Sequence, residues 1–139
     1  MSAVAAPPRL LVVGHGGVLD GERRALLPGA TLVVGRSRSC QLSLRRCRRF
    51  VTSRRQHELL RSDEFQRVSR VHCEIAYLPD GRVEVRDLSR NGTWVNGRRL
   101  ERPRVLVPGD AALSIILADP VHGSLRVVFE TPESELPEA

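Results

Sequence analysis

Short runs of aliphatic and β-branched residues recur along most of this chain, and turn-forming residues separate them. They lie at residues 10–13, 31–35, 41–44, 71–78, 83–88, 93–95, 105–107, 113–117 and 125–130. Such runs predict strands, because β-branched side chains pack well on a pleated surface. Glycine or asparagine lies between several of them, as at Asn91-Gly92 and Asn96-Gly97, where tight turns need a positive φ. This spacing predicts an all-β fold, specifically an antiparallel β-sandwich.

The length of 139 residues, 41% of them hydrophobic, suits one domain with a single core, which we expect over residues 9–130. Residues 1–8 are rich in proline and alanine and residues 131–139 in acidic residues, so both are expected to be tails. No stretch approaches about 18 consecutive apolar residues, and the first residues lack the pattern of a secretory signal. We therefore expect an intracellular protein without a membrane span, nuclear or cytoplasmic, with the nucleus favoured.

The cysteines, Cys40, Cys47 and Cys73, are odd in number and irregularly spaced. This pattern predicts reduced thiols rather than a disulfide framework. Neither the cysteines nor the histidines have the spacing of a zinc site. We therefore expect no metal and no cofactor.

The charge of the chain is concentrated in one segment. All 22 basic residues are arginine, and nine of them lie within residues 45–70 beside three acidic residues, so this stretch accounts for the whole net charge of +6. Arginine offers a planar fork of donors for phosphate or carboxylate groups. Residues 45–67 are long for a loop. Within them, Thr52 or Ser53 is expected to cap a short helix that continues to about Phe65.

Three motifs place polar residues at the ends of expected strands. They are Gly35-Arg36, then Ser69-Arg70-Val71-His72, then the run D-L-S-R-N-G-T-W-V-N-G that begins at Asp87. Each alone is commonplace: a solvated arginine, a loop serine before a half-buried histidine, and two Asn-Gly turns. Together and in this order, inside an all-β chain, they resemble the signature of forkhead-associated domains. The resemblance extends from about residue 10 to residue 130, with residues 45–67 as an insertion.

The resemblance implies a non-catalytic adaptor that binds phosphothreonine in partner proteins. A phosphothreonine carries about −1.5 to −2 charges and three acceptor oxygens, which suit guanidinium and hydroxyl donors. Four residues match positions that hold the phosphate in the family: Arg36, Ser69, Arg70 and Arg90. Asn91 matches the residue that holds the peptide main chain. Four further residues match positions that shape the loops: Gly35, His72, Gly92 and Asn96.

A specificity residue is also implied by the resemblance. In some family members the residue two before the motif serine contacts the third peptide residue after the phosphothreonine. Here that residue is Arg67. We therefore expect acidic residues to be preferred at that place in the partner.

The role of residues 45–67 stays open at the level of sequence. The segment can be a solvated, partly disordered surface loop, or it can widen the positive field and recruit acidic or multiply phosphorylated partners. The main alternative function is a nucleic-acid-binding or nuclear-targeted basic protein that acts through this segment. An enzyme is disfavoured, because Ser69 and His72 begin one strand and have no orienting carboxylate nearby in sequence.

Overall fold

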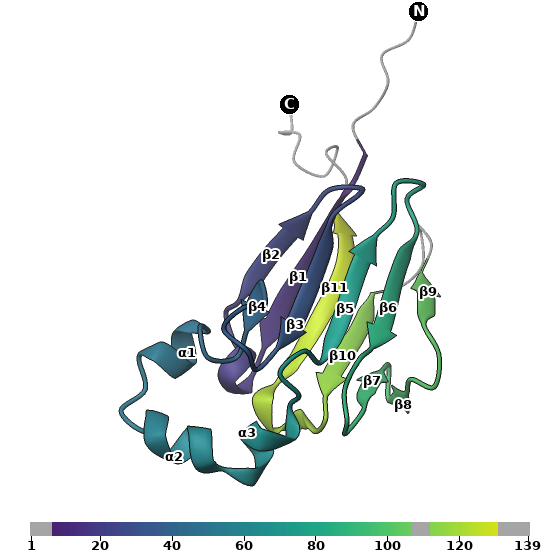
Figure 1. Cartoon of the computed structure of the whole chain (residues 1–139). Helices are drawn as coiled ribbons and strands as arrows, with labels where there is room; N and C mark the ends of the chain where they lie inside the picture. Colours follow the sequence, from purple (N-terminus) through teal and green to yellow (C-terminus); the bar gives the residue numbers. More distant parts are fainter. Residues whose placement is uncertain (1–6, 107–111, 131–139) are drawn as a thin grey trace, which may run out of the picture.

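Two β-sheets pack face to face in this protein (Figure 1). The computed structural model describes residues 7–106 and 112–130, so the expected tails lie outside the described residues except for Pro7 and Pro8. One sheet has six strands, in the spatial order β2 (Arg23–Leu26), β1 (Arg9–His15), β11 (Ser124–Glu130), β10 (Leu113–Leu117), β7 (Thr93–Val95) and β8 (Arg98–Arg99). The other has five, in the order β4 (Leu42–Ser43), β3 (Thr31–Gly35), β5 (Cys73–Tyr77), β6 (Val83–Asp87) and β9 (Arg104–Leu106).

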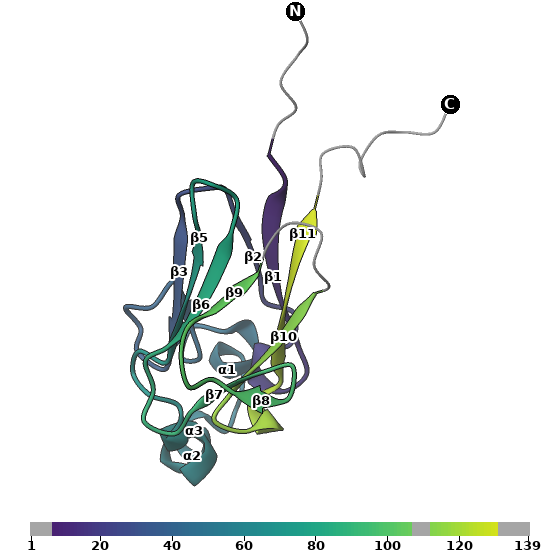
Figure 2. The same cartoon turned by 90° about the vertical axis from the view of Figure 1, so that its right-hand side faces the viewer.

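The core lies between the two sheets, which face each other in Figure 2. Buried side chains from most of the strands fill it. In β5, Cys73, Ile75 and Tyr77 are buried while the residues between them are partly exposed. Alternation of this kind is the period-two pattern of a strand that covers a core on one face. Each fully buried leucine or isoleucine contributes about 1.5–3 kcal/mol, so the strands are held mainly by this shared core.

The β-sandwich predicted from sequence is confirmed, with three differences in detail. Every run predicted as a strand contributes a strand, although residue 107 lies outside the described residues. The strands β2 and β8 were not predicted, because their arginines hide the hydrophobic pattern of these edge strands. One neighbouring pair, β3 and β4, is parallel rather than antiparallel.

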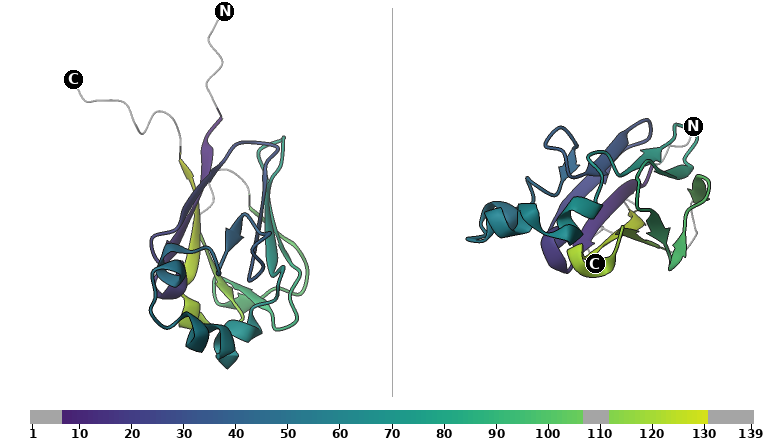
Figure 3. Two further views of the ribbon diagram at one scale, coloured as in Figure 1. Left: turned by 60° about the vertical axis from the view of Figure 1, so that its left-hand side comes forward. Right: turned by 60° about the horizontal axis from the view of Figure 1, so that its bottom comes forward.

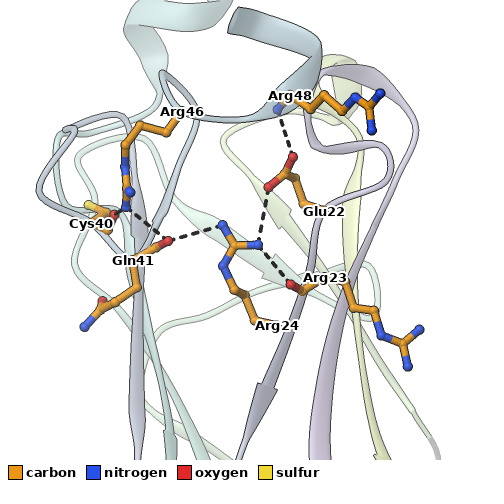
Figure 4. A network of polar contacts seen from close by, with 7 residues as sticks. All are labelled: Glu22, Arg23, Arg24, Cys40, Gln41, Arg46 and Arg48. Atoms are coloured by element: carbon orange, nitrogen blue, oxygen red, sulfur yellow. Dashed lines mark hydrogen bonds and ion pairs between the residues drawn. The ribbon is translucent and has the colours of Figure 1, made fainter.

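A polar network joins the edge strand β2 to the segment around β4 (Figure 4). The Arg24 guanidinium donates to Glu22 Oε1 at 3.3 Å and to the Gln41 carbonyl at 3.4 Å. Arg46 donates to the same Gln41 carbonyl at 3.3 Å. Glu22 Oε2 in turn accepts from the Arg48 backbone N–H at 2.9 Å. The network therefore links both sheets to the start of the arginine-rich segment, residues 45–67.

The arginine-rich segment forms three short helices, α1 (Arg48–Val51), α2 (Gln56–Arg61) and α3 (Asp63–Arg67). The prediction of a single helix capped by Thr52 or Ser53 is wrong. Ser62 is the residue whose side chain caps a helix, since its hydroxyl accepts from the Phe65 N–H at 3.2 Å. Thr52 instead ends α1, with its hydroxyl donating to the Arg48 carbonyl.

Two aromatic side chains anchor these helices to the sandwich. Phe50 and Phe65 are both buried, and their rings stack with centroids 5.4 Å apart. Phe65 also meets the edge of buried His122 in the 3-10 helix η2 (Pro120–His122). The segment is therefore packed onto the core and does not form the solvated loop considered from sequence. No helix in residues 7–106 and 112–130 is long and apolar enough to cross a membrane.

Candidate functional site

Four neighbouring strands bring arginines to the same end of the five-stranded sheet. β3 and β4 run parallel, β5 runs antiparallel to β3, and β6 runs antiparallel to β5. The residues just after β4, β3 and β6 and just before β5 therefore share one end, which is also the end with the three helices (Figure 1). Figure 3 shows this end from below, with the helices extending to one side of the sandwich. We call Arg36, Ser69, Arg70 and Arg90 the strand-end cluster.

Arg36 is held in place by the loop that precedes β5. Its backbone N–H donates to the Ser69 carbonyl at 3.0 Å, and its Nε donates to the Val68 carbonyl at 2.8 Å. Partial burial, together with repulsion from Arg70 and Arg45, lowers the pKa of Arg36. An arginine stays protonated even so. Because Nε is occupied, the two terminal NH₂ groups of the guanidinium are left to bind an anion.

Gly35 allows the close approach of these two segments. A Cβ atom added at this position would lie 2.3 Å from the Arg70 carbonyl oxygen and 2.9 Å from the His72 backbone nitrogen. Contacts this short with backbone atoms force the chain to shift. Any larger residue at Gly35 would therefore separate Arg36 from the loop that carries Ser69 and Arg70.

His72 connects two loops of the site through its two ring nitrogens. Nδ1 accepts from the Ser69 backbone N–H at 3.0 Å, so the proton of the neutral ring lies on Nε2, which donates to the Gly92 carbonyl at 2.7 Å. The side chain is fully buried. Burial lowers the pKa of His72, which favours the neutral ring that this pair of hydrogen bonds requires.

Ser69 presents its hydroxyl between two arginines. Its Oγ accepts from the Arg90 backbone N–H at 3.0 Å, so the hydroxyl hydrogen is free to donate to a ligand. The Arg70 backbone N–H has no hydrogen-bond partner among the described residues. The side chains of Arg70 and Arg90 are exposed and form no ion pair within the described part of the chain. The cluster therefore combines convergent donors with uncompensated positive charge.

A second set of polar residues, not predicted as part of the site, fixes the loop that carries Arg90. Asp87 Oδ1 accepts from the Ser89 N–H at 3.0 Å and from the Thr93 hydroxyl at 2.8 Å. The Ser89 hydroxyl accepts from the Gly92 N–H at 2.8 Å. The Asp-x-Ser spacing before an Asn-Gly turn could have indicated these contacts in the sequence. Aspartate and serine side chains in turns commonly accept from the backbone N–H two residues later.

Gly92 itself is required by the backbone of this loop. Its φ is +102°, and an added Cβ would lie 2.9 Å from the Trp94 ring. Asn96, also expected to shape a loop, lies in the turn between β7 and β8. Its backbone has a φ of 51°, and its Oδ1 accepts from the Ser114 N–H at 2.8 Å. It therefore shapes a turn joined to β10, outside the strand-end cluster.

Asn91 and Arg67 lie beside each other next to the cluster. The Asn91 Nδ2 donates to the Arg67 carbonyl at 2.8 Å, which leaves Asn91 Oδ1 and one amide hydrogen available. The Arg67 side chain is 61% exposed, and its guanidinium lies 3.6 Å from Asp119 Oδ2. Sequence reasoning missed Asp119, because it is more than fifty positions from Arg67 and nothing local marks it.

The model of the FHA domain family matches residues 32–113. No curated protein matches the chain.

Several solved FHA domains are similar in fold. One from a Chlamydia trachomatis protein is 22% identical with a TM-score of 0.60, covering 86% of this chain and 96% of that chain. One from an Arabidopsis thaliana protein is 23% identical with a TM-score of 0.64, covering 100% of this chain and 98% of that chain. The N-terminal FHA domain of S. cerevisiae Rad53p, solved with a phosphothreonine peptide, is 19% identical with a TM-score of 0.57, covering 91% of this chain and 95% of that chain.

Proposed function

Since this chain belongs to the FHA domain family, we propose that it is a non-catalytic adaptor that binds phosphothreonine in partner proteins. FHA domains are binding modules, and one with a similar fold was solved with a phosphothreonine peptide. A second similar structure comes from work on phosphothreonine-dependent FHA interactions. The phosphothreonine-containing protein is therefore the partner that the family favours.

The observation that carries this proposal is the convergence of free donors at the strand-end cluster. The Arg36 NH₂ groups come from the loop after β3, and the Ser69 hydroxyl and the Arg70 N–H come from the loop before β5. The Ser69 oxygen accepts from the Arg90 N–H, and the hydroxyl hydrogen is left to donate, as are the Arg36 NH₂ groups and the Arg70 N–H. With the exposed Arg70 and Arg90 guanidiniums they match the three acceptor oxygens and double charge of a phosphoryl group. Asn91 then holds the peptide main chain through its free Oδ1 and amide hydrogen.

Residues around the cluster keep these donors in place. Gly35 lets the two backbone segments approach, His72 ties the Ser69 loop to Gly92, and Gly92 supplies the positive φ. We propose residues 9–130 as the binding domain, with residues 45–67 as an insertion into it.

Arg36 is proposed to bind the phosphate through its guanidinium. Hydrogen bonds to charged groups contribute about 1.5–3 kcal/mol, so Arg36→Gln should weaken binding of a phosphothreonine peptide about tenfold to a hundredfold. Calorimetric titration with phosphothreonine, phosphoserine and unmodified forms of one peptide measures this. The matched control is Arg126→Gln, an exposed arginine on β11 that removes the same charge elsewhere. Equal binding of modified and unmodified peptides would exclude the proposed function.

The same titration addresses nucleic-acid binding, the alternative function. Proteins that bind single strands without sequence preference stack bases on exposed aromatic rings. Both aromatic residues of the arginine-rich segment, Phe50 and Phe65, are buried and cannot do so. Random-sequence single-stranded DNA should therefore compete with the phosphopeptide only weakly and only at low salt. Nuclear localisation through this segment remains a separate proposal, to be tested by imaging the tagged protein.

We also propose that Arg67 favours an acidic residue three places after the phosphothreonine. Asp119 competes for the same guanidinium, at 3.6 Å. Arg67→Ala should therefore remove any acidic preference in a degenerate phosphopeptide library, whereas Asp119→Asn should strengthen it. Asparagine keeps the Oδ1 atom that accepts from the Val121 N–H at the start of η2, so this short helix is preserved. The proposal is wrong if the native protein shows no acidic preference there and neither variant changes the profile.

A further inference from the structure

We propose that Arg45 is a further anion-binding residue of this site, and that it contacts an acidic or phosphorylated residue preceding the phosphothreonine in a bound peptide. The inference rests on the proposed function, because the phosphothreonine places the peptide. It assigns a ligand contact to the first residue of the arginine-rich segment.

The register of β3 and β4 places Arg45 beside Arg36. Gly35 pairs with Ser43, and the Leu44 N–H donates to the Gly35 carbonyl at 2.9 Å. The buried Ser43 hydroxyl then bridges both arginine backbones: it donates to the Arg36 carbonyl at 3.4 Å and accepts from the Arg45 N–H at 3.1 Å. Two arginines are thus fixed side by side at the ends of adjacent strands.

Arg45 has no compensating partner in the described part of the chain. Its Nε is buried without a hydrogen bond, and none of the described ion pairs includes it. A buried donor without a partner is unfavourable, and so is the repulsion between Arg45 and Arg36, which contributes to the lowered pKa of Arg36. An anion that draws the Arg45 side chain toward it relieves both effects. The side chain is therefore poised to respond to a ligand.

Two of the next three arginines in the segment, Arg46 and Arg49, differ from Arg45 in having side-chain partners. Arg46 donates to the carbonyls of Cys40 and Gln41, so its side chain holds the chain around β4 (Figure 4). Arg49 forms an ion pair with Asp20 at 2.8 Å. Arg45 is therefore better suited than these neighbours to bind a ligand beside the strand-end cluster.

The order of strands indicates which part of a peptide Arg45 meets. Across the sheet the order is β4, β3, β5 and β6, so Arg45 lies on one side of Arg36 while Asn91 follows β6 on the other. Adjacent strands are about 4.8 Å apart, which is comparable to the rise of one or two extended peptide residues. Arg67, whose carbonyl accepts from Asn91, is assigned to the peptide after the phosphothreonine. The residues before it therefore extend toward Arg45.

The test is a cycle between protein variants and peptides. Phosphothreonine peptides carry glutamine, glutamate or phosphoserine at each of the positions just before the phosphothreonine. Each peptide is titrated into the native protein and into three variants: Arg45→Gln, Arg36→Gln and Arg54→Gln. Arg54 is the matched control: it is exposed, belongs to the same segment and removes the same charge. The glutamate and phosphoserine peptides distinguish a carboxylate from a second phosphate as the preferred group.

At one of these positions, the added anion should tighten binding to the native protein and to Arg54→Gln by about threefold to tenfold. With Arg45→Gln the gain, measured against the glutamine peptide in the same variant, should fall below about twofold. A gain that survives Arg45→Gln, or is lost equally in Arg54→Gln, would overturn the inference, as would no gain at any position. Failure of the proposed function is a different result: the glutamine peptide would not bind at all, or would bind equally well to Arg36→Gln.

Discussion

His72 shows how one buried side chain can set both the stability and the shape of the site. Its neutral ring accepts from Ser69 and donates to Gly92, and burial lowers its pKa below the ordinary value of about 6.5. As the pH falls below about 6.5, the unfolded chain binds more protons at this residue than the folded chain does. The free energy of unfolding must therefore decrease as the pH falls.

We expect this decrease to be at most about 1.4 kcal/mol per pH unit from His72 alone, confined to the range between about pH 6.5 and the lowered pKa. Urea unfolding at about pH 7.5 and pH 5.5 measures it. His72→Gln keeps a donor toward Gly92 but cannot titrate, so it should be less stable than the native protein at the higher pH and lose stability less steeply. Equal slopes in the two proteins would show that His72 does not carry the effect.

At the scale of elements, the arginine-rich segment combines short helices of little intrinsic stability with a firm aromatic anchor. Helices of four to six residues are far below the length that is stable alone in water. Their order comes from tertiary contacts, above all the stacked Phe50 and Phe65 and the edge contact with His122. The exposed arginines of the segment therefore belong to a part of the chain that is packed against the sandwich and ends close to Ser69.

Phe65→Ala should accordingly lower the free energy of unfolding by about 3–5 kcal/mol, the usual result of deleting a buried phenylalanine. Urea unfolding measures the change, and Phe65→Leu should cost less because it fills more of the space. The control is Val51→Ala in α1, where the side chain is 50% exposed and about 0.5 kcal/mol or less is expected. An equally small effect of Phe65→Ala would mean that the segment does not depend on this anchor.

At the scale of the whole molecule, the positive charge and the candidate site lie at the same end of the sandwich. The stretch from residue 45 to residue 70 carries the net charge of +6, and its helices lie at the end of the sandwich where β3 and β6 end (Figure 1). Charge gathered around a site speeds association with an anionic partner and makes the rate depend on salt. The opposite end holds the start of β1 and the end of β11, where Arg9 and Glu130 form an ion pair.

The sequence by itself determined the β-sandwich and the candidate residues, because strand alternation and turn residues are local patterns and the three motifs stand in a recognisable order. It could not reveal β2 and β8, whose arginines obscure the alternation of hydrophobic residues. Nor could it reveal the three helices, whose folding depends on the contact of Phe65 with the distant His122. Only the tertiary structure decided which strands are neighbours. The assembled structure joins His72 to Gly92, brings Arg67 close to Asp119, and places Arg45 beside Arg36. Contacts between residues so far apart in the chain form only when the sheets assemble.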